Sequence, residues 1–183
     1  MRLRRRARLA TAGARRLPDF LVIGAQRAGS TSLFAQLCAH SGVAAPSHKE
    51  IHYLDLQSFR SLRWYRSHFP PTAAARGRIT GEASPYYLFH PAVPARVAAE
   101  LPGVLLVALL RDPVPRAYSQ YQLSVRDGHE QLGFEEALRA EPDRLAGEEA
   151  RLLSDRAYRA DAHRHQSYAA RGLLPKVPSN LRH

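Results

Sequence analysis

The sequence predicts a three-layer α/β fold, in which helices flank a parallel sheet. Three segments are expected to form its central strands, Phe20–Ile23, Ile79–Glu82 and Val104–Leu110. The first and the last are uninterrupted apolar runs, which is typical of strands buried on both faces of a parallel sheet. A stripe of apolar residues at helical spacing follows the first run, at Leu33, Phe34, Leu37 and Cys38. Strand and helix therefore alternate from the start of the fold.

Length and composition indicate one globular domain. The chain has 183 residues and a hydrophobic content of 45%, which is enough for a real core. We expect the domain at residues 18–172, a basic disordered tail at 1–17 and an irregular tail at 173–183. No apolar stretch of the length of a signal peptide or a membrane span (~20 residues for a span) is found. The single cysteine, Cys38, fits a reducing, cytoplasmic location.

The charge of the chain predicts an anionic partner. Lys and Arg number 27 against 16 Asp and Glu, which gives a formal net charge of +11. A nucleotide, a sulfated or phosphorylated ligand, nucleic acid and a membrane surface all fit such a surplus. Much of it lies in the arginine-rich segment at 2–16, which we interpret as a solvated tail, so nucleic-acid binding is not expected.

A turn flanked by glycines joins the first predicted strand to its helix, from Gly24 to Gly29. Such a turn can cradle a phosphate, because backbone N–H groups converge there and the helix dipole favours an anion. The segment almost matches the nucleotide-binding P-loop, but Ser30 stands where the P-loop lysine would follow the second glycine. The basic residue is Arg27, inside the turn, so ATP or GTP chemistry is not expected. A turn that binds nothing is the alternative.

Two further segments carry polar side chains suited to a site. Glu50 and His52 would point to the same side of a short extended piece, and a carboxylate beside an imidazole can serve as a general base. A solvent-facing pair at a strand end is the alternative. Arg111 follows the last predicted strand, where ligands of open α/β sheets bind, and Ser119 would face it from a helix that begins near Pro115.

These segments together resemble the sulfotransferases that use 3′-phosphoadenosine 5′-phosphosulfate (PAPS), above all the bacterial members and the heparan sulfate sulfotransferases. The turn is similar to their 5′-phosphosulfate-binding loop, with Arg27 where the family has lysine. Glu50, His52 and Asp55 match the family segment E-x-H-[FY]-[FL]-D. The resemblance thus implies a sulfotransferase fold related to the P-loop nucleotide-hydrolase folds.

Two more segments carry the same resemblance. Gly81–Tyr87 is similar to the turn G-E-[KA]-[ST]-P-x-Y, and Ala83 stands where many members have a lysine that reaches the sulfuryl group. Arg111–Tyr121 is similar to the 3′-phosphate-binding region L-R-[DN]-P-x-x-R-x-x-S-x-Y, in which Arg111 and Ser119 would hold the phosphate. We interpret Arg116 as a structural arginine that pairs with Asp112.

The resemblance implies transfer of a sulfuryl group from PAPS to a hydroxyl or amine acceptor, a carbohydrate or a small molecule, which leaves adenosine 3′,5′-bisphosphate and needs no metal. Glu50 would be the base, with His52 in reserve, and Arg27 would neutralise charge on the bridging oxygen and the 5′-phosphate. The expected cofactor-binding residues are Gln26, Arg27, Ala28, Gly29, Ser30, Thr31, Ser32, Arg111 and Ser119.

Two other functions remain open from the sequence, a P-loop-type nucleotide kinase and a truncated nucleotide-binding or nucleic-acid-binding remnant without activity. The resemblance ends near Gly172, and Pro175 and Pro178 break any helix after it. The family's last strand and loop therefore have no counterpart in the sequence. We expect a shortened domain with an open sheet edge, marginal stability, a tendency to associate and weak or no activity.

Overall fold

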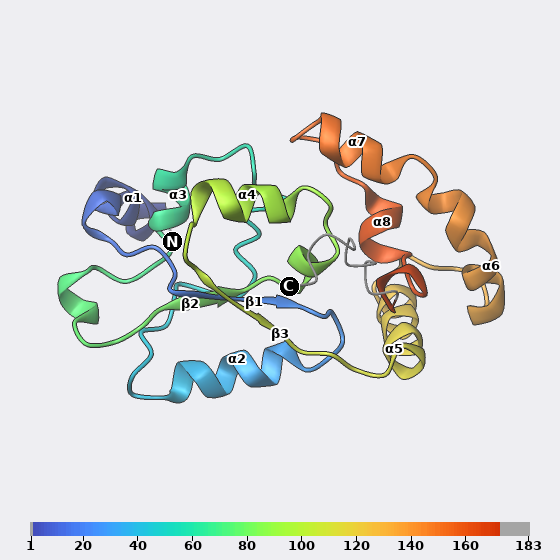
Figure 1. Cartoon of the computed structure of the whole chain (residues 1–183), viewed down its shortest axis with the longest axis horizontal. Coiled ribbons are helices and arrows are strands. Elements are labelled where there is room, and N and C mark those ends of the chain that lie inside the picture. The colour runs from blue at the N-terminus through green and yellow to red at the C-terminus, as the bar shows by residue number, and fades with distance from the viewer. Residues whose placement is uncertain (1, 173–183) are drawn as a thin grey trace, which may run out of the picture. The chain divides into compact units, whose positions relative to one another are not determined.

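The computed structural model describes residues 2–172 (Figure 1), so the predicted irregular tail at 173–183 lies outside the described residues. Its contacts define two compact units where the sequence predicted one domain. The first comprises residues 2–110 and 147–160, and the second comprises 111–146 and 161–172. Among the described residues, none of the helices is both long enough and apolar enough to cross a membrane.

A parallel sheet of three strands forms the centre of the first unit. The strands β1 (Phe20–Gly24), β2 (Gly81–Ala83) and β3 (Leu105–Ala108) lie in the order β2-β1-β3. All three predicted strands are confirmed, although the second and third are shorter than expected. The second begins late because Ile79 pairs with Val43 in an isolated bridge before β2 starts.

Helices cover both faces of this sheet (Figure 1), and the predicted three-layer α/β fold is confirmed. Side chains alternate along β1: Phe20 and Val22 pack with Phe34 of α2 (Ser30–Ala39), whereas Leu21 packs on the opposite face. On that face the cluster includes Tyr65 from α3 (Leu62–Arg66) and residues of α4 (Val93–Glu100). Burial of alternate side chains on two faces explains why the segment is apolar without interruption.

The structure differs from the expected disordered tail at residues 1–17. A helix, α1 (Arg2–Ala10), and a 3-10 helix at Ala12–Ala14 lie there, and Ala12 is completely buried. The Arg15 guanidinium donates to the Phe69 carbonyl at 2.8 Å. These long-range contacts hold the segment against the first unit, which composition alone does not predict.

Three of the remaining elements of the first unit are short. Two are 3-10 helices, at Ala73–Ala75 and Pro85–Leu88, and the third is α7 (Glu148–Ser154). Ser61 caps the start of α3 by accepting the Trp64 N–H at 3.3 Å.

The second unit is helical. It contains α5 (Pro113–Arg126), α6 (Phe134–Leu145), α8 (Asp161–His165) and a 3-10 helix at Ala170–Gly172. Its core holds a buried carboxylate, Glu130, which accepts from Arg144 at 2.6 Å and from the Tyr168 hydroxyl at 2.9 Å. Gly147 separates α6 from α7 and has a left-handed φ of 77°.

The strand β3 has exposed apolar side chains, and β1 is the strand paired with it in the described part of the chain. Leu105 is 68% exposed and Leu106 is 53% exposed. We expect the protein to self-associate through this edge, because an unpaired apolar strand is a template for pairing with another chain. Leu106→Lys should make the protein more monomeric in sedimentation velocity across micromolar concentrations.

Leu153→Lys is the control for this substitution, since Leu153 is also an exposed leucine, 61% accessible, but lies on α7 and on no sheet edge. It should leave association unchanged. A wild-type protein that stays monomeric over the whole concentration range would contradict the expectation.

Candidate functional site

The turn between β1 and α2 has the backbone of an anion-binding loop. Arg27 and Gly29 adopt left-handed conformations, with φ of 70° and 99°. Gly29 is the N-cap residue of α2 and no side chain caps this helix. Because the first N–H groups of a helix have no acceptor within it, those of the first turn of α2 are available to an anion. The exposed Arg27 side chain adds a positive charge in the same loop.

Gly24 is required for a different reason, because the end of the Gly81–Tyr87 segment and the residue after it pack closely against Gly24. A Cβ at Gly24 would lie 2.7 Å from the Leu88 Cβ, which is closer than such atoms approach. Ala83, which lies in the same Gly81–Tyr87 segment, pairs with Val22 of β1. The strand-to-helix loop and the Gly81–Tyr87 segment are thus neighbours at the carboxyl ends of β1 and β2.

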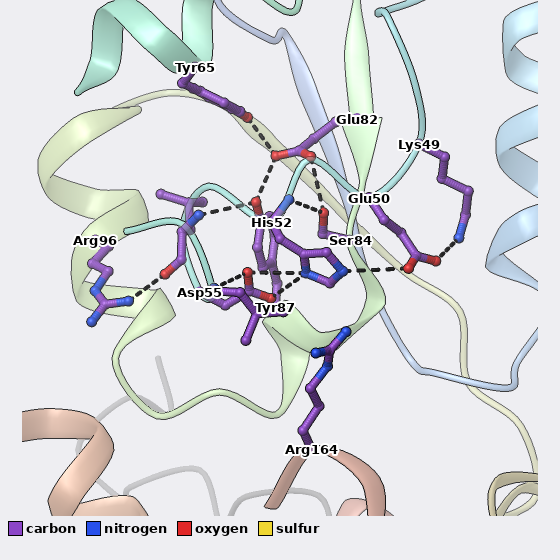
Figure 2. A network of polar contacts seen from close by, with 12 residues as sticks. Lys49, Glu50, His52, Asp55, Tyr65, Glu82, Ser84, Tyr87, Arg96 and Arg164 are labelled. Carbon is purple, nitrogen blue, oxygen red and sulfur yellow. Dashed lines mark hydrogen bonds and ion pairs between the residues drawn. The ribbon is translucent and has the colours of Figure 1, made fainter. Parts of the chain in front are cut away.

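Glu50, His52 and Asp55 form one cluster (Figure 2). The imidazole lies between the two carboxylates: Nε2 is 3.5 Å from Glu50 Oε2, and Nδ1 is 2.8 Å from Asp55 Oδ2. Lys49 forms a close ion pair with Glu50 on the side away from His52. The cluster therefore holds two carboxylates, one imidazole and one ammonium group in contact.

The expected extended conformation of this segment is wrong. Glu50 and His52 have φ of 59° and 57°, in the left-handed region. The two side chains still meet, because the Glu50 N–H donates to the Ala83 carbonyl at 3.0 Å and thereby anchors the segment at the end of β2. The turn that carries Arg27 follows β1, so this turn and the Glu50 cluster both lie at the carboxyl edge of the sheet, where α/β folds bind ligands.

The charges of this cluster are strongly coupled. Burial disfavours the imidazolium of His52, but hydrogen bonds with Asp55 and Glu50 outweigh that effect and raise its pKa to about 9. The hydrogen bond with His52, with a further contribution from Lys49, outweighs burial and lowers the pKa of Glu50 to about 2. At neutral pH the cluster thus holds a carboxylate at Glu50 and an imidazolium at His52.

Arg111 and Ser119, the predicted 3′-phosphate ligands, belong to the second unit. Arg111 is exposed just before α5, and Ser119 is partly buried on it. The helix begins at Pro113 rather than near Pro115, because the Asp112 carboxylate caps it by accepting the Val114 N–H at 2.9 Å. Where these two residues lie relative to the loop of the first unit stays a prediction.

The predicted pairing of Arg116 with Asp112 does not match the contacts found. The Arg116 side chain is buried and donates to the Tyr168 carbonyl within the second unit, while Asp112 serves as the helix cap. The structural interpretation of Arg116 fits its burial, with a different partner.

Two residues near the cluster were missed by the sequence analysis. Lys49 could have been found, since it directly precedes Glu50 and the pair carries opposite charges. Glu82 gave no usable signal beyond its place in the turn motif, because its contacts come from residues 17 and 5 positions away and from Ser84. In the part of the chain that the structure describes, no group of three or more His, Cys, Asp or Glu side chains could hold a metal ion.

Comparison with known proteins relates this chain to sulfotransferases. No family model matches the chain. It is 38% identical over 111 residues to the membrane-associated sulfotransferase kil1 of Dictyostelium discoideum. It is also 38% identical over 109 residues to the human heparan sulfate glucosamine 3-O-sulfotransferase 6. The chain is homologous to sulfotransferases.

The fold of this sulfotransferase homologue is also similar to that of a solved sulfotransferase structure. The crystal structure of a sulfotransferase from Alicyclobacillus acidocaldarius superposes with a TM-score of 0.62 at 28% identity. The match covers 85% of this chain and 66% of that chain. The resemblance to bacterial and heparan sulfate sulfotransferases is therefore confirmed.

The alignments cover only part of each relative. The alignments with kil1 and with the human 3-O-sulfotransferase each cover 60% of this chain, but only 24% and 31% of those proteins. The chain thus spans about a quarter of the length of kil1 and just under a third of that of the human enzyme. The sulfotransferase relationship rests on this shared portion.

Proposed function

We propose that this chain carries the donor-binding loop and the proton acceptor of a PAPS-dependent sulfotransferase. The observation that carries the proposal is the position of the Glu50–His52–Asp55 cluster, at the same carboxyl edge of the sheet as the Arg27 loop. A base and an anion cradle at one sheet edge are what transfer of an anionic group to a hydroxyl requires.

The loop residues fit the 5′ end of PAPS. A left-handed Gly29 leaves open space, with no atom within 4 Å of where a Cβ would stand. The N–H groups of Ser30, Thr31 and Ser32 and the Arg27 guanidinium would bind the 5′-phosphate and balance charge on its bridging oxygen. PAPS supplies an activated sulfuryl group, whose bond to the 5′-phosphate breaks as one to the acceptor forms.

Glu50 is the better base of the two alternatives. A general base must be unprotonated when the acceptor binds, and at neutral pH Glu50 is a carboxylate while His52 already carries its proton. Glu50 would take the proton from the acceptor hydroxyl or amine, and the imidazolium would hold the carboxylate in place. Asp55 in turn orients the imidazole from the opposite nitrogen.

Carbohydrate is the acceptor class we favour. The relatives include heparan sulfate glucosamine 3-O-sulfotransferases and a heparan sulfate N-deacetylase/N-sulfotransferase, which by name act on a sugar hydroxyl and a sugar amine. A cytoplasmic location also stays part of the proposal, on the single Cys38. The kinase alternative is less favoured, because Ser30 replaces the lysine that kinases of this loop type use.

Binding of adenosine 3′,5′-bisphosphate, measured by calorimetry with ATP as competitor, tests the donor site. We expect the bisphosphate to bind and ATP to compete weakly, since ATP has no 3′-phosphate. Turnover of labelled PAPS with a panel of oligosaccharide acceptors then tests the reaction. Preferential binding of ATP would favour the kinase instead.

Arg27→Ala should weaken binding of adenosine 3′,5′-bisphosphate by ~10-fold or more, since a charge-assisted hydrogen bond contributes about 1.5–3 kcal/mol. Turnover should fall as well. Arg139→Ala is the matched control, because that arginine is 74% exposed on α6 and its contacts with Glu135 are local to that helix, at 3.9 Å from the carboxylate and 3.3 Å from the carbonyl. Equal affinities of wild type and Arg27→Ala would remove the loop from the donor site.

A further inference from the structure

A buried carboxyl group lies beneath the Glu50 cluster and takes no part in the proposed chemistry. Glu82, on β2, is 0% exposed. Three hydroxyls donate to it: those of Tyr65 and Tyr87 reach Oε1 at 2.7 and 2.8 Å, and that of Ser84 reaches Oε2 at 3.1 Å. Burial raises the pKa of Glu82, against the opposing effect of these hydrogen bonds. Burial of a carboxyl group costs free energy, so we expect Glu82 to have a structural or functional role.

Two of these hydroxyls also hold the loop that carries the cluster (Figure 2). The His52 N–H donates to Ser84 Oγ at 3.2 Å, and the Leu54 N–H donates to the Tyr87 hydroxyl at 3.2 Å. A hydroxyl has one proton to give and two lone pairs that accept. Because Glu82 takes the proton of each, their lone pairs are left to face the two backbone amides.

The third hydroxyl, that of Tyr65, donates to the same Glu82 oxygen, and the Tyr65 ring stacks on Tyr53 with ring centroids 4.2 Å apart. The two tyrosines thus share one acceptor atom and nearly complete burial, at 0% and 1% exposed. Of these two tyrosines, Tyr87 is the one whose hydroxyl also accepts from a loop amide, that of Leu54.

We propose that Glu82 is a positioning residue, which fixes the hydroxyls of Ser84 and Tyr87 as acceptors for the amides of residues 52 and 54. Its two oxygens thereby set the backbone on both sides of Tyr53 and hold His52 between Glu50 and Asp55. That this matters for turnover rests on the proposed sulfotransferase function. Its role in setting the geometry of His52 does not depend on that function.

The test compares Tyr87→Phe with Tyr65→Phe in the full chain and follows the His52 imidazole by NMR, assigned through the His52→Gln spectrum. In the wild type the imidazole should titrate with a pKa of about 9. Tyr87→Phe should lower this pKa by about one unit or more, because a displaced loop weakens contacts that favour the imidazolium. Tyr65→Phe should leave it nearly unchanged, although both variants lose one hydrogen bond to Glu82.

Glu82→Gln should lower the His52 pKa further than Tyr87→Phe, since it disturbs the hydrogen bonds of both the Tyr87 and the Ser84 hydroxyl. If Glu82→Gln does not fold, Ser84→Ala tests the hydrogen bond of Ser84 with the His52 N–H alone, and it should also lower the pKa of His52. Equal shifts in the two tyrosine variants, or no shift in Tyr87→Phe, would overturn the proposal.

Turnover provides a separate reading. Tyr87→Phe should lose ~10-fold or more in turnover at unchanged affinity for adenosine 3′,5′-bisphosphate, because a small misplacement of a catalytic group is enough to slow a reaction by this much. Tyr65→Phe should retain most of its turnover. If the His52 pKa shifts as expected but the wild-type chain turns over no PAPS, the positioning role stands and the proposed function fails.

Discussion

Glu50→Gln should cut turnover of PAPS by ~10²–10⁴-fold, the usual contribution of a general base. The amide keeps the size of the side chain but cannot take a proton from the acceptor. Affinity for adenosine 3′,5′-bisphosphate should change little, because Glu50 lies in the cluster with Lys49 and His52 and outside the phosphate loop. Labelled PAPS for turnover and calorimetry for affinity separate the two effects.

The control for this substitution is Glu135→Gln. Glu135 is 89% exposed on α6, where it lies 3.9 Å from Arg139, so its loss should leave both turnover and affinity unchanged. A Glu50→Gln variant that retains its activity, together with a His52→Ala variant that has lost it, would assign the base to His52. The pKa of about 9 for His52 speaks against that outcome, since an imidazolium accepts no proton.

Stability should fall as the pH rises from about 6.5 to about 9, by up to ~3 kcal/mol attributable to His52. The folded-state pKa of His52, about 9, lies above its ordinary value of 6.5. A group with a raised pKa stabilises the fold fully below its unfolded-state pKa, and that contribution is lost as the pH rises through the folded-state value. Urea unfolding at a series of pH values measures the effect.

His52→Gln isolates this contribution, because it removes the imidazole that titrates over this pH range. The free energy of unfolding of the wild type should decline more steeply over this pH range than that of the variant. His40→Gln should behave like the wild type, since the exposed His40 contacts only its local turn, at the Gly42 N–H. Parallel curves for wild type and His52→Gln would contradict an imidazolium held between Glu50 and Asp55.

Local patterns in the sequence were sufficient for the frame of the fold. The apolar run at Phe20–Ile23 specified β1, because four successive apolar side chains can be buried only when both sheet faces are covered. Gly29 and the stripe of α2 specified the turn and the helix after it. Gly147 marked the break between α6 and α7, where its left-handed φ is needed. Each of these signals lies within one element.

The site was predictable in its membership but less so in its geometry. Glu50, His52 and Asp55 could be selected from motif resemblance, and the structure brings them together. The left-handed backbone of Glu50 and His52 could not be predicted, since a positive φ is uncommon in residues other than glycine. It is imposed by hydrogen bonds to Ala83 and Ser84, more than 30 residues later in the chain.

The three central strands, the glycine-flanked turn after the first of them and the identity of the charged residues Glu50, His52 and Asp55 could all be predicted from sequence, because periodicity and turn chemistry act between near neighbours. The tertiary structure alone decided that residues 2–16 pack on the first unit, that Asp55 and Glu50 share one imidazole, and that Glu82 lies beneath them. The physical reason is that burial and hydrogen bonds between distant segments set the charge of His52 and the conformation of its loop, and neither leaves a pattern in the local sequence.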